Sequence, residues 1–499
     1  MTMESFRDLE ATRISQPMIV RPLFWFLVSL ISLVPLCLVL PLASTRVGVG
    51  AIVLWTILIW VAISFVRGRT HYVVPLWVAF YPYCYSLFSF PQDRPIFTVD
   101  RAIILVLLIE MLIVSRQGLA AVPLTRDVLI SGFIWCLYVV VCFLSIALHS
   151  TSRELSLYRL LVEGMVMPGL LGLYAIRYFP VIEDLQKLHI CACILGLGLF
   201  TTGLFELTTG IDLFPWGGSE PLFTETHLRR ADGPFEQQVV LSVVAILTFF
   251  FILYLGRVTS SDRPTWLTLL HKAGCLASLG GSLLTLNRGL IVALVPIAII
   301  DSFARRRLLS RRTWAAFFSL VLLAALAAKA LDPLLYEDRV SNPDNVYQRI
   351  AQHQETLSVF REYPLFGVGF ALYHDFALQN PQYMTRWKGI ESMTVQHNVL
   401  MTVLTDEGIV GLILYCSSQV FLIVAMWRIR KAFPLGWLIF VYCVLVYLLI
   451  GLDYATVYYS DINLFYVLII CIIYQVQLRI SRAEVPADFA SPQMVTQVR

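Results

Sequence analysis

The chain has 499 residues, 58% of them hydrophobic and 14% charged, and its mean hydropathy is +0.76. These values exclude an ordinary soluble domain and indicate a polytopic membrane protein. The ten cysteines lie almost entirely inside apolar runs without CxxC spacing, so they indicate neither a disulfide framework nor a metal site. Because the net charge of +4 is modest, the positions of the charges are more informative than their sum.

Apolar runs recur along the whole chain at lengths suited to membrane-spanning helices, about 17 to 25 residues each. The first run is too long for a cleavable signal peptide and is interpreted as a signal anchor. We expect an all-α polytopic membrane protein with about 12 to 14 transmembrane helices. The candidate runs are 22–43, 47–66, 72–91, 102–115, 127–148, 157–177, 188–207, 237–256, 266–286, 289–303, 314–330, 399–426, 436–451 and 463–478.

Short basic clusters predict the orientation, because short cytoplasmic loops retain Lys and Arg. With the N-terminus inside, clusters such as Arg305–Arg312 and Trp427–Lys431 fall on the cytoplasmic side, and two long polar segments fall on the outer side. The predicted organisation is a cytoplasmic N-terminal tail (1–21), an N-terminal transmembrane bundle (22–207), an outer loop with an arginine pair (208–236), transmembrane helices with a junction at Arg288 (237–330), a large outer loop (331–397), C-terminal transmembrane helices (398–478) and a cytoplasmic tail (479–499).

The large outer loop is longer than a connector needs to be, which is typical of a functional or a disordered segment. Its apolar residues Val346, Ile350, Leu357 and Phe360 recur at helical spacing and are followed by "YPLFGVG", a pattern that ends a helix. We therefore expect an amphipathic helix at the outer membrane interface, then a tight turn and further ordered structure.

Two arginine sites stand out on the outer side of this topology. Arg229 and Arg230 precede the helix that begins near Gln237, where they either anchor the helix at the interface or bind a ligand. Arg288 follows Asn287 between two apolar runs, which indicates either an exposed hairpin tip or a break at membrane depth that faces a polar cavity. Arginine suits a diphosphate because its planar fork of donors binds two oxygens and keeps its charge.

His397 lies between the large outer loop and an apolar run. A helix N-terminus disfavours the protonated imidazole, which would leave a neutral base, although an isolated interfacial histidine is often structural.

Arg159 and Glu163 are four residues apart, so they lie on the same face of a helix. This spacing favours an ion pair in which each neutralises the other; contact with substrate is the alternative. Glu110 and His189 fall nearer the cytoplasmic side and are poorer candidates. No P-loop, dinucleotide fingerprint, HExxH or GxSxG motif is present, so nucleotide-driven chemistry is not supported.

From His397 the sequence reads His-Asn, nine residues, Gly408, two residues and Gly411. This pattern resembles the signature of the bacterial O-antigen ligase and O-antigen polymerase superfamily. "RADGPF", "LNRG" and "YQRIAQHQETLSVFREYPLFGVGF" precede it in the family's order, and the resemblance covers roughly residues 150 to 430. "FEQQ" departs from the family's usual continuation, so the assignment stops at Arg230.

The resemblance implies a GT-C-like membrane glycosyltransferase that is metal-independent, needs no cofactor and uses an undecaprenyl-diphosphate glycan donor. It implies that Arg288 and Arg230 hold the diphosphate, with Arg229 able to replace Arg230, and that His397 deprotonates or orients the acceptor hydroxyl. The supporting residues are Asn398, which either orients His397 or caps the helix, Glu407, expected as a structural hydrogen-bond partner, and the motif glycines Gly408 and Gly411.

The implied partners are the lipid-linked donor, a glycan, lipid A core or protein acceptor, membrane lipid and other polysaccharide-assembly proteins, with no nucleic acid. The implied location is the bacterial inner membrane, with the active site facing the periplasm. The signature does not separate polymerase from ligase; the absence of any feature tied to lipid A core favours a polymerase slightly. A lipid-linked glycan flippase or transporter is the alternative from another class, but it predicts midplane charges and internal repeats, which are not apparent.

Overall fold

The computed structural model describes residues 72–87, 99–116, 122–149, 155–209, 231–235, 237–259, 264–285, 287–304, 308–331, 344–392 and 397–482. Several predictions lie outside these residues. They are the N-terminal tail, the apolar runs 22–43 and 47–66, both arginines of the pair Arg229 and Arg230, and the final residues 483–499.

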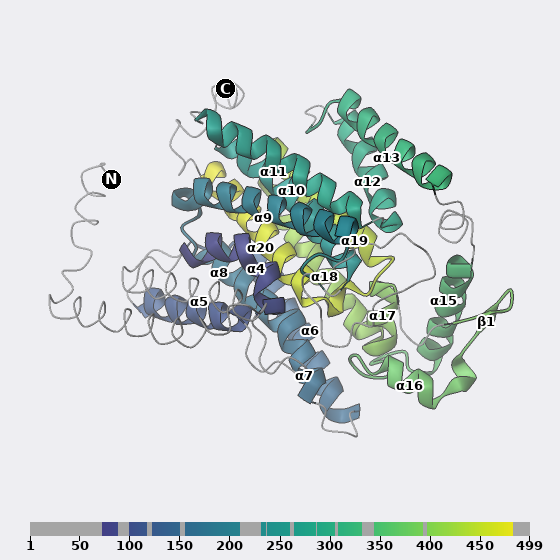
Figure 1. Ribbon diagram of the computed structural model, residues 1–499. Helices are drawn as coiled ribbons and strands as arrows, with labels where there is room; N and C mark the ends of the chain where they lie inside the picture. Colours follow the sequence, from purple (N-terminus) through teal and green to yellow (C-terminus); the bar gives the residue numbers. More distant parts are fainter. Residues whose placement is uncertain are drawn as a thin grey trace, which may run out of the picture.

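The described part of the chain is almost entirely helical, so the predicted all-α class is confirmed (Figure 1). A small antiparallel hairpin pairs β1 (Arg386–Trp387) with β2 (Ile390–Glu391). The helices are α4 (Val73–Leu87), α5 (Val99–Arg116), α6 (Arg126–His149), α7 (Leu155–Leu161), the π-helix η3 (Val162–Val166), α8 (Met167–Arg177), α9 (Val181–Thr209), α10 (Gln238–Val258), α11 (Thr265–Leu284), α12 (Arg288–Phe303), α13 (Arg311–Leu331), α15 (Asp344–Glu362), α16 (Tyr373–Gln379), the short 3-10 helix η5 (Pro381–Tyr383), α17 (Val399–Asp406), α18 (Gly408–Arg428), α19 (Pro434–Gly451), the short 3-10 helix η6 (Thr456–Tyr458) and α20 (Ser460–Ser481).

Eight helical segments of the described chain are long and apolar enough to cross a membrane, and two shorter apolar helices accompany them. This supports the multi-pass architecture. The long segments are α6, the continuous stretch α7 to α8, α9, α10, α11, α18, α19 and α20.

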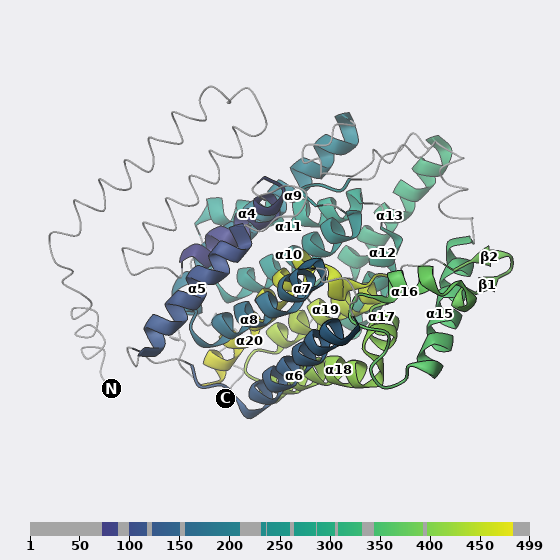
Figure 2. The same cartoon turned by 90° about the horizontal axis from the view of Figure 1, so that it is seen from below.

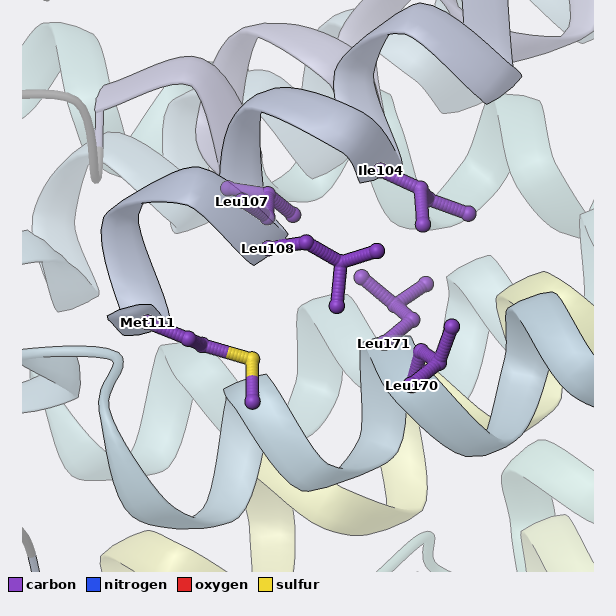
Figure 3. Close-up of a pocket in the computed structure, with 6 residues that line it drawn as sticks. All are labelled: Ile104, Leu107, Leu108, Met111, Leu170 and Leu171. Carbon is purple, nitrogen blue, oxygen red and sulfur yellow. The ribbon is translucent and has the colours of Figure 1, made fainter. Parts of the chain in front are cut away.

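α10 forms the centre of the bundle. It is apolar on all sides and nearly all of its side chains are buried, because α9, α11, α19 and α20 pack around it. α6 and α18 pack on each other at the periphery and leave much of their apolar surface exposed, as expected for helices that face lipid (Figure 2). α5 packs on α8 through leucine-rich faces (Figure 3).

The predicted apolar run 157–177 is continuous but contains one π-helical turn at η3. Asn463 stabilises this turn by donating from Nδ2 to the carbonyl oxygens of Gly164 (3.1 Å) and Val457 (3.0 Å). The tight approach of α20 and its preceding connector to the turn explains the small residue at 164, where a Cβ would lie 3.1 Å from the Val457 oxygen.

The prediction of one continuous helix over 399–426 is wrong, because the structure divides this run into α17 and α18. Gly408 has a φ of +68°, which a helix interior does not allow and which suits glycine. The segment 364–369 binds to this break. Val368 N donates to Thr405 O (2.8 Å), Gly369 N to Asp406 O (2.8 Å), and Ile409 N to Pro364 O (2.9 Å). The "YPLFGVG" turn therefore satisfies backbone groups that the helix break leaves without intrahelical partners.

The two ends of the bundle differ in composition. At one end, here called the basic end, Arg428 pairs with Asp127 (2.9 Å) and Arg482 Nη2 donates to Pro123 O (3.4 Å). The opposite end, here called the loop end, carries residues 344–392, and there Phe370 N donates to Ser145 Oγ near the end of α6 (3.0 Å).

The predicted helix in the large loop is confirmed as α15, which ends just before Tyr363 and Pro364. Figure 1 shows α15 running steeply across the direction of α9, α10 and α11. It contacts α17 and the β-hairpin through a buried face that includes Ala351, Glu355 and Val359, while Val346 and Leu357 stay exposed. An exposed apolar stripe on a helix lying across the bundle is the arrangement expected of an interfacial helix.

Candidate functional site

His397 lies at the loop end, directly before Asn398, the N-cap residue of α17. Asn398 caps this helix, since its Oδ1 accepts hydrogen bonds from Leu400 N (2.9 Å) and Met401 N (3.2 Å). The cap holds the backbone that presents His397, and the imidazole packs edge-on against Tyr454 with ring centroids 6.2 Å apart. Of the two roles considered for Asn398, the structure shows capping.

An ion pair between Arg349 and Asp453 lies beside this histidine. The guanidinium of Arg349 on α15 contacts the Asp453 carboxylate and also donates from Nη1 to the Asp453 carbonyl oxygen (2.9 Å). About a third of each side chain is exposed, at 33% and 31%. The pair therefore connects the large loop to the segment between α19 and α20 while keeping both charges accessible.

The beginning of α12 reaches the same place. Asn287 caps α12 through a bond from Gly289 N to its Oδ1 (2.9 Å), and its Nδ2 donates to Ser242 Oγ on α10 (2.9 Å). A Cβ on Gly289 would lie 2.6 Å from Asp453 Oδ2, so the glycine lets the Asp453 carboxylate approach the start of α12 closely. Arg288 is the first residue of α12; its side chain is outside the described atoms, but its backbone position brings it to the Asp453 region.

Burial and charge both favour a neutral imidazole at His397. Its pKa is lowered from the ordinary value, first by desolvation in its half-buried position and then by the positive charge of Arg349, while Asp453 acts in the opposite direction. A neutral imidazole can accept a proton near neutral pH.

The arginine pair Arg229 and Arg230 precedes a described turn that α9 holds in place. Glu206, 2% exposed at the end of α9, accepts hydrogen bonds from Gly233 N (2.7 Å) and Asp232 N (3.2 Å). Gly233 has a φ of +62°, a left-handed backbone conformation that glycine adopts readily because it has no Cβ. Glu206 therefore fixes the chain two residues after Arg230, a role that the sequence did not indicate.

Arg159 and Glu163 form the expected pair, with Arg159 Nε 3.1 Å from Glu163 Oε2. Arg101 on α5 contacts the other carboxylate oxygen, so one acid is shared by two arginines. Glu110 and His189 have partners away from the His397 region, because Tyr174 OH donates to Glu110 Oε2 (2.8 Å) and His189 Nε2 lies 3.0 Å from His271 Nδ1.

The motif residues after His397 form the α17–α18 break. A Cβ on Gly408 would overlap the backbone of Leu365, and one on Gly411 would overlap the side chain of Glu407. Glu407 is 1% exposed, and among the described residues its Oε2 has no hydrogen-bond partner. The hydrogen-bonding role expected for Glu407 is therefore not confirmed; its side chain packs over Gly411.

Sequence reasoning missed Arg349, Asp453 and Tyr454 as site residues. The available signal was "LDYATVYYSD" at 452–461, a polar stretch between two apolar runs that is too polar for a bilayer core. Arg349 lies inside the helix of the large loop, for which only the spacing of the apolar residues was considered. Among the described residues, no group of three or more His, Cys, Asp and Glu side chains is arranged to hold a metal ion.

These features define a multi-pass α-helical membrane protein with a candidate site at one end of the bundle, where a histidine of lowered pKa, an arginine–aspartate pair and a capped helix start carrying an arginine come together. Residues 273–416 match the family model described as O-antigen ligase. That segment includes Arg288, Arg349 and His397, and the match confirms the resemblance to the O-antigen ligase and polymerase superfamily. It also supports glycan transfer of the ligase or polymerase type as the general activity. No curated protein matches the sequence.

Proposed function

We propose that this protein transfers a glycan from an undecaprenyl-diphosphate carrier to an acceptor sugar hydroxyl on the periplasmic face of the bacterial inner membrane. The observation that carries this proposal is the convergence of His397, the Arg349–Asp453 pair and the start of α12 at Arg288, within or beside the matched residues 273–416.

The proposed reaction is a displacement at the anomeric carbon of the donor sugar. The acceptor oxygen forms the new glycosidic bond, the bond from the anomeric carbon to the phosphate oxygen breaks, and its electron pair leaves with the lipid diphosphate. The acceptor proton passes to a ring nitrogen of His397, whose lowered pKa keeps it unprotonated at neutral pH.

Stabilisation of the leaving diphosphate is assigned to arginine. Arg288, together with Arg230 or Arg229, would bind the phosphate oxygens in pairs, and this contact strengthens as negative charge develops on the leaving oxygen. The positive guanidinium groups can neutralise the charge of the leaving diphosphate, as a divalent cation does in other enzymes. This supports a metal-independent reaction.

Within this class we favour a repeat-unit polymerase for O-antigen or exopolysaccharide over an O-antigen ligase. The test uses full-length protein in lipid nanodiscs with an undecaprenyl-diphosphate repeat unit from its own host, and it separates products by size. A ladder of lengthening chains is expected. Product that appears only after lipid A core or a protein acceptor is added would identify a ligase, and translocation without any new glycosidic bond would reject the transferase.

A further inference from the structure

A second cationic cluster lies at the loop end, formed by Arg101 on α5, Arg159 on α7 and Glu163 in η3. Arg159 Nε lies 3.1 Å from Glu163 Oε2, and Arg101 contacts Oε1 of the same carboxylate. These three groups together carry a charge of +1, and the buried Asp100 carboxyl lies within electrostatic range of Arg101 and Glu163. The side chains of Arg101 and Arg159 remain 23% and 28% exposed, whereas that of Glu163 is only 11% exposed.

The carboxylate of this cluster belongs to a local irregularity of the helix. π-helical turns are rare and occur frequently at functional sites. The turn at Val162–Val166 is stabilised by Asn463 Nδ2, which bonds the Gly164 carbonyl oxygen, and Asn463 Oδ1 in turn accepts from Tyr447 OH (2.8 Å). A network of buried polar groups thus maintains the turn that presents Glu163 to both arginines.

The cluster and the His397 region are connected by one short segment. Asp453 contacts Arg349, and four residues later the Val457 oxygen contacts the π-turn at Gly164. Four residues extend over at most roughly 14 Å, so the two regions lie within roughly 20 Å of each other along this path. They are close enough for one glycan substrate to reach both.

We propose that Arg101 and Arg159 bind the diphosphate of the acceptor, a second polyprenyl-linked glycan. This inference rests on the proposed transferase function and specifies its acceptor. A polymerase handles two lipid diphosphates at once. The donor diphosphate is the leaving group and must lie at the reacting carbon. The acceptor keeps its own diphosphate, which is separated from the reacting hydroxyl by the length of a repeat unit.

The chemistry of the cluster suits this ligand. Paired guanidinium groups recognise phosphate oxygens through bidentate, charge-assisted hydrogen bonds. Glu163 keeps the two arginines together in the absence of ligand, and one arginine exchanges its contact with Glu163 for a phosphate oxygen when the acceptor binds. A lipid substrate reaches such a site from the outer leaflet without leaving the membrane.

The test measures how many molecules of undecaprenyl diphosphate bind full-length protein, by native mass spectrometry of the detergent-solubilised chain. Wild-type protein is expected to bind two molecules. The double variant Arg101→Gln/Arg159→Gln is expected to bind one, with the second binding step weakened at least about tenfold because charge-assisted bonds are lost. Arg386→Gln is the matched control, since Arg386 also pairs with a carboxylate, that of Glu391, at the loop end, and it should still bind two.

A second variant separates binding from a purely structural role. Glu163→Gln leaves both arginines in place and removes the competing carboxylate, so it should bind the second diphosphate more tightly than wild type. If the cluster only joined α5 to the π-turn, Glu163→Gln would lower the melting temperature without changing affinity. That result, a wild-type stoichiometry of one, or a double variant that still binds two would each overturn the proposal.

Transfer activity is measured separately, with a soluble acceptor glycan that lacks a diphosphate. If wild-type protein binds two diphosphates but transfers no glycan, the second site stands and the proposed function fails. If transfer occurs but the double variant is impaired equally with soluble and lipid-linked acceptors, the proposed function stands and the second site fails.

Discussion

Burial and two opposite charges together determine the pKa of His397. Desolvation lowers the pKa of the imidazole most, the positive charge of Arg349 lowers it further, and the Asp453 carboxylate raises it. The ion pair beside the histidine thus adjusts its basicity as well as linking α15 to the segment between α19 and α20.

This balance predicts opposite pH shifts for the two partners. If His397 is the base, kcat/KM falls as pH drops through its pKa. Arg349→Gln removes the charge that lowers this pKa, so the acid limb should move to higher pH. Asp453→Asn removes the charge that raises it, so the limb should move to lower pH. pH profiles of transfer measure both, and limbs that coincide with that of wild type would contradict a basic role for His397.

Substitution of the two central residues should abolish most of the activity without unfolding the protein. His397→Ala removes the proposed base and Arg288→Ala a proposed diphosphate ligand, so each should reduce kcat about 10²-fold or more. His374→Ala, an exposed histidine on α16, is the control and should keep wild-type rates. Melting temperatures close to wild type, measured alongside the rates, show that the variants are folded; a folded His397→Ala protein with full activity would refute the site.

At the scale of elements, the α17–α18 break determines how the large loop meets the bundle. Residues 364–371 form backbone bonds to both sides of the break, and Ala371 N also donates to Asp406 Oδ2 (3.2 Å). Because the same short helix α17 begins with the Asn398 cap, displacement of the loop would move the residues that present His397.

Gly408→Ala should therefore destabilise the protein and lower its activity together. The added methyl would overlap the Leu365 backbone, and the φ of +68° is strained for alanine. Gly132→Ala is the matched control, since a Cβ there meets nothing within 4 Å and alanine favours the helix. Thermal unfolding and transfer rates compare the two; a Gly408→Ala protein as stable as the Gly132→Ala protein would show that the break does not require glycine.

At the scale of the whole molecule, the basic end and the loop end lie at opposite ends of the bundle. The proposed transferase reaction requires the loop end to face the periplasm. Short basic clusters between helices, such as Trp427–Lys431 at the other end, favour this orientation, because short cytoplasmic loops retain Lys and Arg.

The orientation predicts which sites a membrane-impermeant maleimide reaches in cells with a permeabilised outer membrane. Lys388→Cys, at the exposed tip of the β-hairpin, should react in intact spheroplasts, and Arg430→Cys, after α18, should react only after lysis. The unsubstituted protein serves as the background control for its native cysteines. The reverse pattern would place the site in the cytoplasm and reject the proposed periplasmic reaction.

The sequence by itself determined the helical membrane class and the helix of the large loop, and it selected Arg288 and His397 as candidate site residues. These features follow from local physics, since hydrophobic length, helical spacing and isolated charges in an apolar chain are all visible along one dimension.

Only the tertiary structure decided which polar residues meet. Asp453 is 56 residues after His397, and Arg349 is 48 residues before it, so no local pattern relates them. The break at Gly408 was missed for the same reason: the run 399–426 is apolar enough to continue as one helix, and it ends early because a distant loop segment supplies hydrogen bonds at that point. Contacts between distant segments depend on how helices pack, and packing is a property of the folded chain.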